Sequence, residues 1–138
     1  MDLEKLATQD NANEGVWVQA IIYGKKQPFD IKILGADSDA VTLFNRERLK
    51  KLKINSKNGI DVDEDAIDEI LDNNDENVVV RIAGLRSRDK EPLMLNGVEL
   101  QSDARSYRLL VEKIPAVKDF VMKISNERTN FLSDRKKN

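Results

Sequence analysis

Apolar residues recur at helical spacing in two runs near the C-terminus: Tyr107, Leu110, Val111 and Ile114, then Val117, Phe120, Val121 and Ile124. Residues three and four apart share one face of an α-helix, so each run predicts an amphipathic helix that packs through its apolar side. Ser102 is a suitable N-cap for the first helix, with Asp103 in its first turn. Pro115 has no amide hydrogen and fits the first position of the second. Residues 102–132 are therefore expected to form a pair of helices.

A pattern typical of β-strands lies nearer the N-terminus. Residues 16–23 are mostly β-branched or aromatic, and Phe29, Ile31 and Ile33 alternate with polar residues after a turn at 24–28. This arrangement predicts a β-hairpin. Pro28 is expected at the start of the second strand, where a missing amide hydrogen costs least.

A helix is expected to follow Asp37 and Ser38, either of which can cap it. Its apolar face would consist of Val41, Phe44, Leu49 and Leu52. The remaining positions are basic: Arg46, Arg48, Lys50, Lys51 and Lys53. We interpret the basic run as a solvated face with cations near the C-terminal end of the helix. A patch that binds phosphate or a protein partner is the alternative.

The stretch from Asp61 to Glu76 holds nine acidic residues and no basic one. Its first aspartates resemble the start of a calcium-binding loop, but Ala66 replaces the glycine of the sharp turn and Asp72 replaces the bidentate glutamate. An acidic, solvated helix is therefore expected, with electrostatic attraction of a basic partner as the alternative. Residues 78–85 fit either helix or strand, and their spacing slightly favours helix. The Asn96-Gly97 step predicts a small hairpin.

Composition narrows the classes of function. Twenty-three basic residues nearly cancel 25 acidic ones to give a net charge of −2, which argues against binding a nucleic-acid backbone. The chain has no cysteine and no histidine, the residues that most often serve as thiolate ligand, general base and metal ligand. It also has no glycine-rich phosphate loop. We therefore expect no catalysis, no cofactor and no metal site.

No apolar run approaches the roughly 20 residues that cross a bilayer, and the N-terminus lacks the features of a signal peptide. A cytoplasmic protein without membrane contact is expected. At 138 residues the chain predicts a single α+β domain over residues 15–132, with an N-terminal β-hairpin packed with several helices and a C-terminal pair of amphipathic helices. Residues 1–14 are expected to be a flexible arm with little to bury, and residues 133–138 a flexible charged tail.

Five residues are candidates for contact with another protein: Trp17, Tyr23, Arg128, Asn130 and Phe131. Each also has a purely structural interpretation. The two aromatic residues of the hairpin can cover the core. The last three can end a helix, with the arginine near the final carbonyl groups, the asparagine as a left-handed cap and the phenylalanine folded onto the core.

Three segments in this order resemble the tail assembly chaperones of long-tailed bacteriophages. They are the hairpin, Gly-x-Asp-Ser and basic helix of residues 16–51, the acidic helix with RIAGL and the turn that follows, and the closing IPAVKDFVMKISNERTNFL. Together they span about residues 15–132. One position departs from the family pattern. Members commonly have a tryptophan just before the glycine that corresponds to Gly84, whereas this chain has Ala83 there and carries its tryptophan at position 17.

The resemblance implies a non-enzymatic role in the host cytoplasm. Such chaperones bind the long, helical tape-measure protein, keep it soluble until tail-tube subunits polymerise around it, and are absent from the mature virion. Many also exist in a longer, frameshifted form that recruits the tail-tube protein, and codons for Lys136, Lys137 and Asn138 can supply the slippery run of adenines. Self-association is a further expected contact. The alternatives are a structural tail-completion or head–tail connector protein and a small nucleic-acid-binding regulator.

Overall fold

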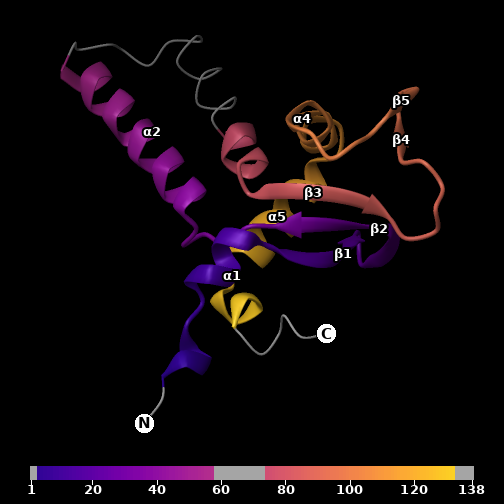
Figure 1. Ribbon diagram of the computed structural model, residues 1–138. Coiled ribbons are helices and arrows are strands. Elements are labelled where there is room, and N and C mark those ends of the chain that lie inside the picture. The colour runs from indigo at the N-terminus through magenta and orange to yellow at the C-terminus, as the bar shows by residue number, and fades with distance from the viewer. Residues whose placement is uncertain (1–2, 58–73, 133–138) are drawn as a thin grey trace.

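The computed structural model describes residues 3–57 and 74–132 and has an α+β architecture (Figure 1). The N-terminal half contains η1 (Glu4–Leu6), α1 (Gln9–Glu14), β1 (Val16–Ile22), β2 (Lys25–Ile33) and α2 (Asp39–Lys57). After a helical stretch at residues 74–79 come β3 (Ile82–Ser87), β4 (Met94–Leu95), β5 (Val98–Glu99), α4 (Ala104–Lys113), α5 (Pro115–Asn126) and η2 (Arg128–Phe131). The predicted fold class is confirmed.

The predicted hairpin is present and belongs to a three-stranded antiparallel sheet with the order β1-β2-β3. Tyr23 and Gly24 both have positive φ angles, 55° and 72°, and form its tight turn. The prediction that Pro28 begins the second strand is wrong, because β2 starts at Lys25. Pro28 instead lies at an irregularity where residues 27–29 stand opposite Ala20 alone. Such a bulge tolerates a residue that cannot donate a ladder hydrogen bond.

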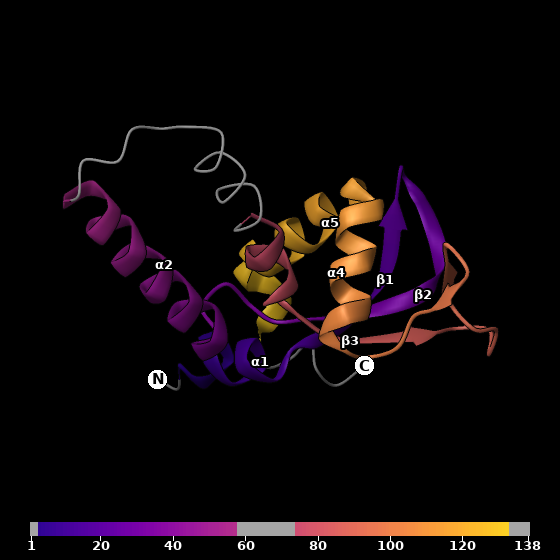
Figure 2. The ribbon, with the colours of Figure 1, turned by 90° about the horizontal axis from the view of Figure 1, so that it is seen from above.

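Helices α4 and α5 pack on one face of the sheet and confirm the predicted helical pair (Figure 2). The core consists of buried apolar side chains from the sheet, the helical stretch at 74–79 and both helices: Ala20, Ile22, Ile31, Ile33, Val78, Ile82, Leu85, Tyr107, Leu110, Val111, Val117 and Val121. Asp103, rather than Ser102, caps α4, since its carboxylate accepts a 2.8 Å hydrogen bond from the Ser106 amide. Ser102 bonds to the backbone of Leu85 in β3 instead.

Residues 9–14 are more buried than the flexible arm that the sequence predicted. They form α1, in which Asn11 and Ala12 are buried. The Asn11 side chain donates a 3.1 Å hydrogen bond to the carbonyl of Phe131. Ala12 packs against Gly35 so closely that a Cβ added to Gly35 would lie 2.6 Å from the alanine Cβ. Small side chains at both positions therefore allow α1 to dock on the domain.

Residues 78–85 contain both predicted alternatives in succession. The chain is helical through residue 79 and enters β3 at Ile82, so the preference for helix is wrong for the second half of this segment. Ile82 and Leu85 pair with isoleucines of β2 and complete the core, an arrangement that local spacing does not reveal. The small hairpin is confirmed as β4 and β5, joined through Asn96 and Gly97 at φ angles of 51° and 77°. The acidic stretch before residue 74 lies outside the described residues.

Helix α2 forms where predicted, and the Ser38 hydroxyl accepts a hydrogen bond from the Val41 amide at its start. Its predicted apolar face is wrong in part. Val41 is buried and Phe44 is half-buried, but Leu49 is 60% exposed. Figures 1 and 2 show α2 extending away from the sheet and from α4 and α5. A helix that leaves the domain in this way has only its first turns to bury.

Candidate protein-interaction surfaces

The ring of Trp17 forms a platform on the face of the sheet that α4 and α5 leave open. The guanidinium carbon of Arg86 lies 4.2 Å from the ring centroid, and the ammonium nitrogen of Lys32 lies 6.0 Å from it. Both distances suit cation–π attraction, which contributes about 0.5–1 kcal/mol at exposed sites. The tryptophan remains 39% exposed. It is therefore part of the structure and still accessible to another molecule.

Asp30 lies beside this platform and fixes the arginine that stacks on it. Its carboxylate accepts 2.8 Å hydrogen bonds from Arg86 and from Arg88. Burial alone would raise the pKa of the Asp30 carboxyl, but the hydrogen bonds and charges of Arg88 and Arg86 outweigh burial and lower this pKa below its usual 3.8. The carboxylate is buried and the two arginines are half-exposed. Asp30 thus orients two cations on an open surface.

Tyr23, the second aromatic candidate, lies in the hairpin turn with its side chain 82% exposed. The structure thus places it away from the core, contrary to its interpretation as core cover. An exposed tyrosine at a loop tip is well suited to contact a partner. Trp17 lies near the start of β1 and Tyr23 follows its last residue, so the structure does not bring them together.

The three C-terminal candidates each stabilise the fold, and each does so through a different contact. Phe131 is buried in the core and is not available for contact. Asn130 is not a left-handed cap, because its φ angle is not positive. Its side-chain amide instead donates a 3.1 Å hydrogen bond to the carbonyl of Ile124 and so caps the end of α5.

Arg128 joins the C-terminal turn to the loop before α2. Its guanidinium donates to both carboxylate oxygens of Asp37 at 2.6 and 3.0 Å, a bidentate pair. This hydrogen bond, opposed by partial burial, lowers the pKa of the Asp37 carboxyl, and it raises the pKa of Arg128. The pair orients the base of α2 and does not leave the arginine available as an unpaired contact residue.

Arg81 is a buried residue that the sequence did not single out. Its guanidinium donates to the Ser125 hydroxyl at 3.3 Å and to the Asn77 side chain at 3.2 Å. Ser125 in turn donates to the carbonyl of Leu34 at 2.8 Å. Burial lowers the pKa of Arg81. This polar network connects the ends of β2, β3 and α5, and no sequence motif distinguishes such an arginine from an exposed one.

The projecting helix α2 exposes apolar side chains that the sequence assigned no role or an inward one. Leu43 is 56% exposed and Leu49 is 60% exposed. Basic residues lie close to them in the sequence of the helix: Arg46, Lys50 and Lys51, which are exposed, and Arg48, which is half-buried. We call Leu43, Leu49 and these four cations the α2 surface. Leucine and basic side chains together form a surface that suits an apolar partner with acidic flanks.

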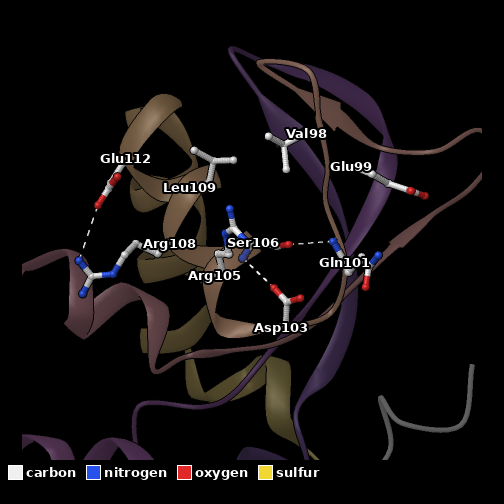
Figure 3. A pocket seen from close by; sticks show the side chains of 9 residues that line it. All are labelled: Val98, Glu99, Gln101, Asp103, Arg105, Ser106, Arg108, Leu109 and Glu112. Atoms are coloured by element: carbon white, nitrogen blue, oxygen red, sulfur yellow. Dashed lines mark hydrogen bonds and ion pairs between the residues drawn. The ribbon is translucent and has the colours of Figure 1, made fainter.

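Two depressions border the β4–β5 hairpin. The larger, of about 500 Å³, is lined by Val98, Glu99, Gln101, Asp103, Arg105, Ser106, Arg108, Leu109 and Glu112 (Figure 3). Internal bonds already engage much of its polar lining, since Ser106 bonds to Asp103 and Gln101, and Arg108 pairs with Glu112 and Glu76. The smaller, of about 230 Å³, is mostly apolar and lies between β2, β3, α4 and the small hairpin. Neither presents a set of reactive groups.

Within residues 3–57 and 74–132, no group of three or more acidic, histidine or cysteine side chains is arranged to hold a metal ion. In the same part of the chain, no helix combines the length and apolar character that crossing a membrane requires. No protein-family model matches the chain, and neither a curated protein nor a solved structure is significantly similar to it.

Proposed function

We propose that this protein is a non-enzymatic assembly chaperone of a long-tailed bacteriophage. In this proposal it binds helical segments of the tape-measure protein in the host cytoplasm, and it is absent from the mature virion. The resemblance of residues 15–132 to tail assembly chaperones supports the class of function. The observation that carries the mode of binding is the α2 surface, which lies outside the packed core.

The chemistry of the α2 surface favours one kind of partner. Leu43 and Leu49 offer apolar contact. The four basic residues of this surface outnumber Glu47, the acidic residue that lies among them in the sequence. An amphipathic helix with acidic residues beside its apolar stripe complements both features. A tape-measure protein offers many such helical stretches, so several chaperone molecules could coat one long chain. Coating would cover the apolar stripes that otherwise drive aggregation.

Co-expression with the tape-measure protein tests the proposal. The wild-type chain is expected to keep the tape-measure protein in the soluble fraction and to co-purify with it. The double variant Leu43→Ser, Leu49→Ser is expected to lose most of this effect while keeping its own circular dichroism spectrum. The matched control is Met94→Ser, which removes a similarly exposed apolar side chain from β4. If the double variant rescued solubility as well as wild type did, the α2 surface would not be the binding surface.

Two further measurements separate this proposal from the alternatives. Mass spectrometry of purified virions should find no stoichiometric copies of the chain, whereas a connector or tail-completion protein would be present in every particle. A gel-shift assay should show no tight, salt-sensitive DNA binding, which a regulator would require. Binding to the tape-measure protein should itself weaken as salt rises, because Arg46, Lys50 and Lys51 of the α2 surface are exposed.

A further inference from the structure

Strand β1 is an unprotected edge of the sheet. Among the described residues no strand pairs with its outer side, since the order is β1-β2-β3. The opposite edge differs, because the Ser102 hydroxyl bonds to both the amide and the carbonyl of Leu85 in β3, at 2.9 and 2.8 Å. An uncovered edge leaves a row of backbone donors and acceptors available to another strand.

The sequence of β1 lacks the features that usually prevent such pairing. Residues 16–23 include no charged residue and no proline, although edge strands are commonly blunted by both. The irregularity in the hairpin also lies on the other strand, where residues 27–29 of β2 stand opposite Ala20. The extra residues of this irregularity therefore belong to β2 and not to β1.

The exposed side chains of β1 are complementary to a second copy of the same strand. Trp17 is 39% exposed and Ile21 is 45% exposed, and each lies two residues from Gln19. If two β1 strands pair antiparallel about Gln19, Ile21 of each copy stands opposite Trp17 of the other and can pack against the base of its ring, whose far edge lies over Gly84. A two-fold interface repeats this apolar contact twice. Cross-strand aromatic and β-branched pairs of this kind each stabilise a sheet by about 0.2–1 kcal/mol.

We infer that a second copy of this chain pairs with the outer edge of β1, antiparallel and centred on Gln19, and joins two three-stranded sheets into one. The inference does not depend on the proposed function and is tested without the tape-measure protein. Sedimentation equilibrium of the full chain should show a monomer–dimer equilibrium. Ile21→Lys should raise the dissociation constant at least tenfold, because it places a charge in the seam. Met94→Lys, an exposed position on β4, should leave the constant unchanged.

Cysteine cross-linking tests the register, and the chain has no cysteine of its own. Under mild oxidation Gln19→Cys alone should form a disulfide dimer, because paired residues bring their Cα atoms to about 5 Å. Ile21→Cys mixed with Trp17→Cys should form the heterodimer. Ile21→Cys alone should not, since its two copies would lie about 14 Å apart. A monomer at every concentration, an Ile21→Lys variant that dimerises like wild type, or cross-linking of Ile21→Cys with itself but not of Gln19→Cys would overturn the inference.

Discussion

The ring of Trp17 in β1 reaches across β2 and lies directly over Gly84 in β3. A Cβ added to Gly84 would lie 2.7 Å from the Cη2 atom of Trp17 and 3.3 Å from the Cβ atom of Lys32. Real side chains do not approach so closely, so the glycine is required by the ring above it. The resemblance expected a tryptophan immediately before this glycine in sequence. In this chain a tryptophan covers the same glycine from another strand.

Gly84→Ala is expected to destabilise the fold through the ring of Trp17. Overpacking of this kind costs about 1–3 kcal/mol. Urea denaturation followed by circular dichroism measures the loss. In the double variant Trp17→Ala, Gly84→Ala the cost should be smaller than the sum of the two single costs, because the clash no longer exists. Additive single and double effects would show that the ring and the glycine do not interact.

Asp30→Asn is expected to lower the free energy of unfolding by about 1.5–3 kcal/mol at pH 7, the range for hydrogen bonds to charged groups. The folded pKa of Asp30 is depressed, so its contribution is fully present above the unfolded pKa near 3.8. It is lost as the pH falls through the lower, folded pKa. The difference in unfolding free energy between wild type and variant should therefore be constant from pH 7 to about pH 5 and begin to shrink below about pH 4.

Unfolding by urea at a series of pH values measures this difference for Asp30→Asn. Asp119→Asn controls for the loss of one negative charge at an exposed position. A difference in unfolding free energy as large at pH 2 as at pH 7 would mean that the arginine pairing does not account for the stabilisation. The intrinsic fluorescence of Trp17, the single tryptophan, should also change in Asp30→Asn, since Asp30 orients the arginine above the ring.

Phe131→Ala is expected to cost about 3–5 kcal/mol of stability, the usual range for removing a buried aromatic ring. Thermal unfolding measures the loss. Tyr23→Ala should change the midpoint little, because its side chain is largely exposed. The two variants thus separate a candidate that holds the fold from a candidate that is available for contact. A Phe131→Ala variant as stable as wild type would contradict the buried position of the ring.

Ser125→Ala is expected to cost about 1–3 kcal/mol, because it leaves the buried guanidinium of Arg81 and the carbonyl of Leu34 each short of a hydrogen bond. Arg81→Met together with Ser125→Ala should restore part of this loss, since the double variant buries no unpaired cation. Urea denaturation of the three variants compares them. A double variant that is less stable than the sum of the single effects would contradict this account.

Local pattern was sufficient to predict the hairpin, α2, the Asn96-Gly97 turn and the pair α4 and α5, because each depends on residues close together in sequence. The third strand was not predicted, since Ile82 and Leu85 acquire strand geometry only by pairing with β2. Burial of Asn11 likewise depends on a residue 120 positions away. Of the candidate contact residues, Tyr23 is exposed and Phe131 is not. Aromatic residues look alike in sequence, and only the tertiary structure distinguishes their roles.

The contact between α1 and η2 has a consequence for biosynthesis. Asn11 is made early, yet the carbonyl that its side chain donates to belongs to Phe131. Contacts between such distant parts of a chain form late, because closing a long loop is entropically costly. A nascent chain that still lacks Phe131 therefore offers α1 only part of its docking site, the contacts with Gly35 and Asp39. The first helix of the domain should become resistant to proteases last, only after translation has passed that residue.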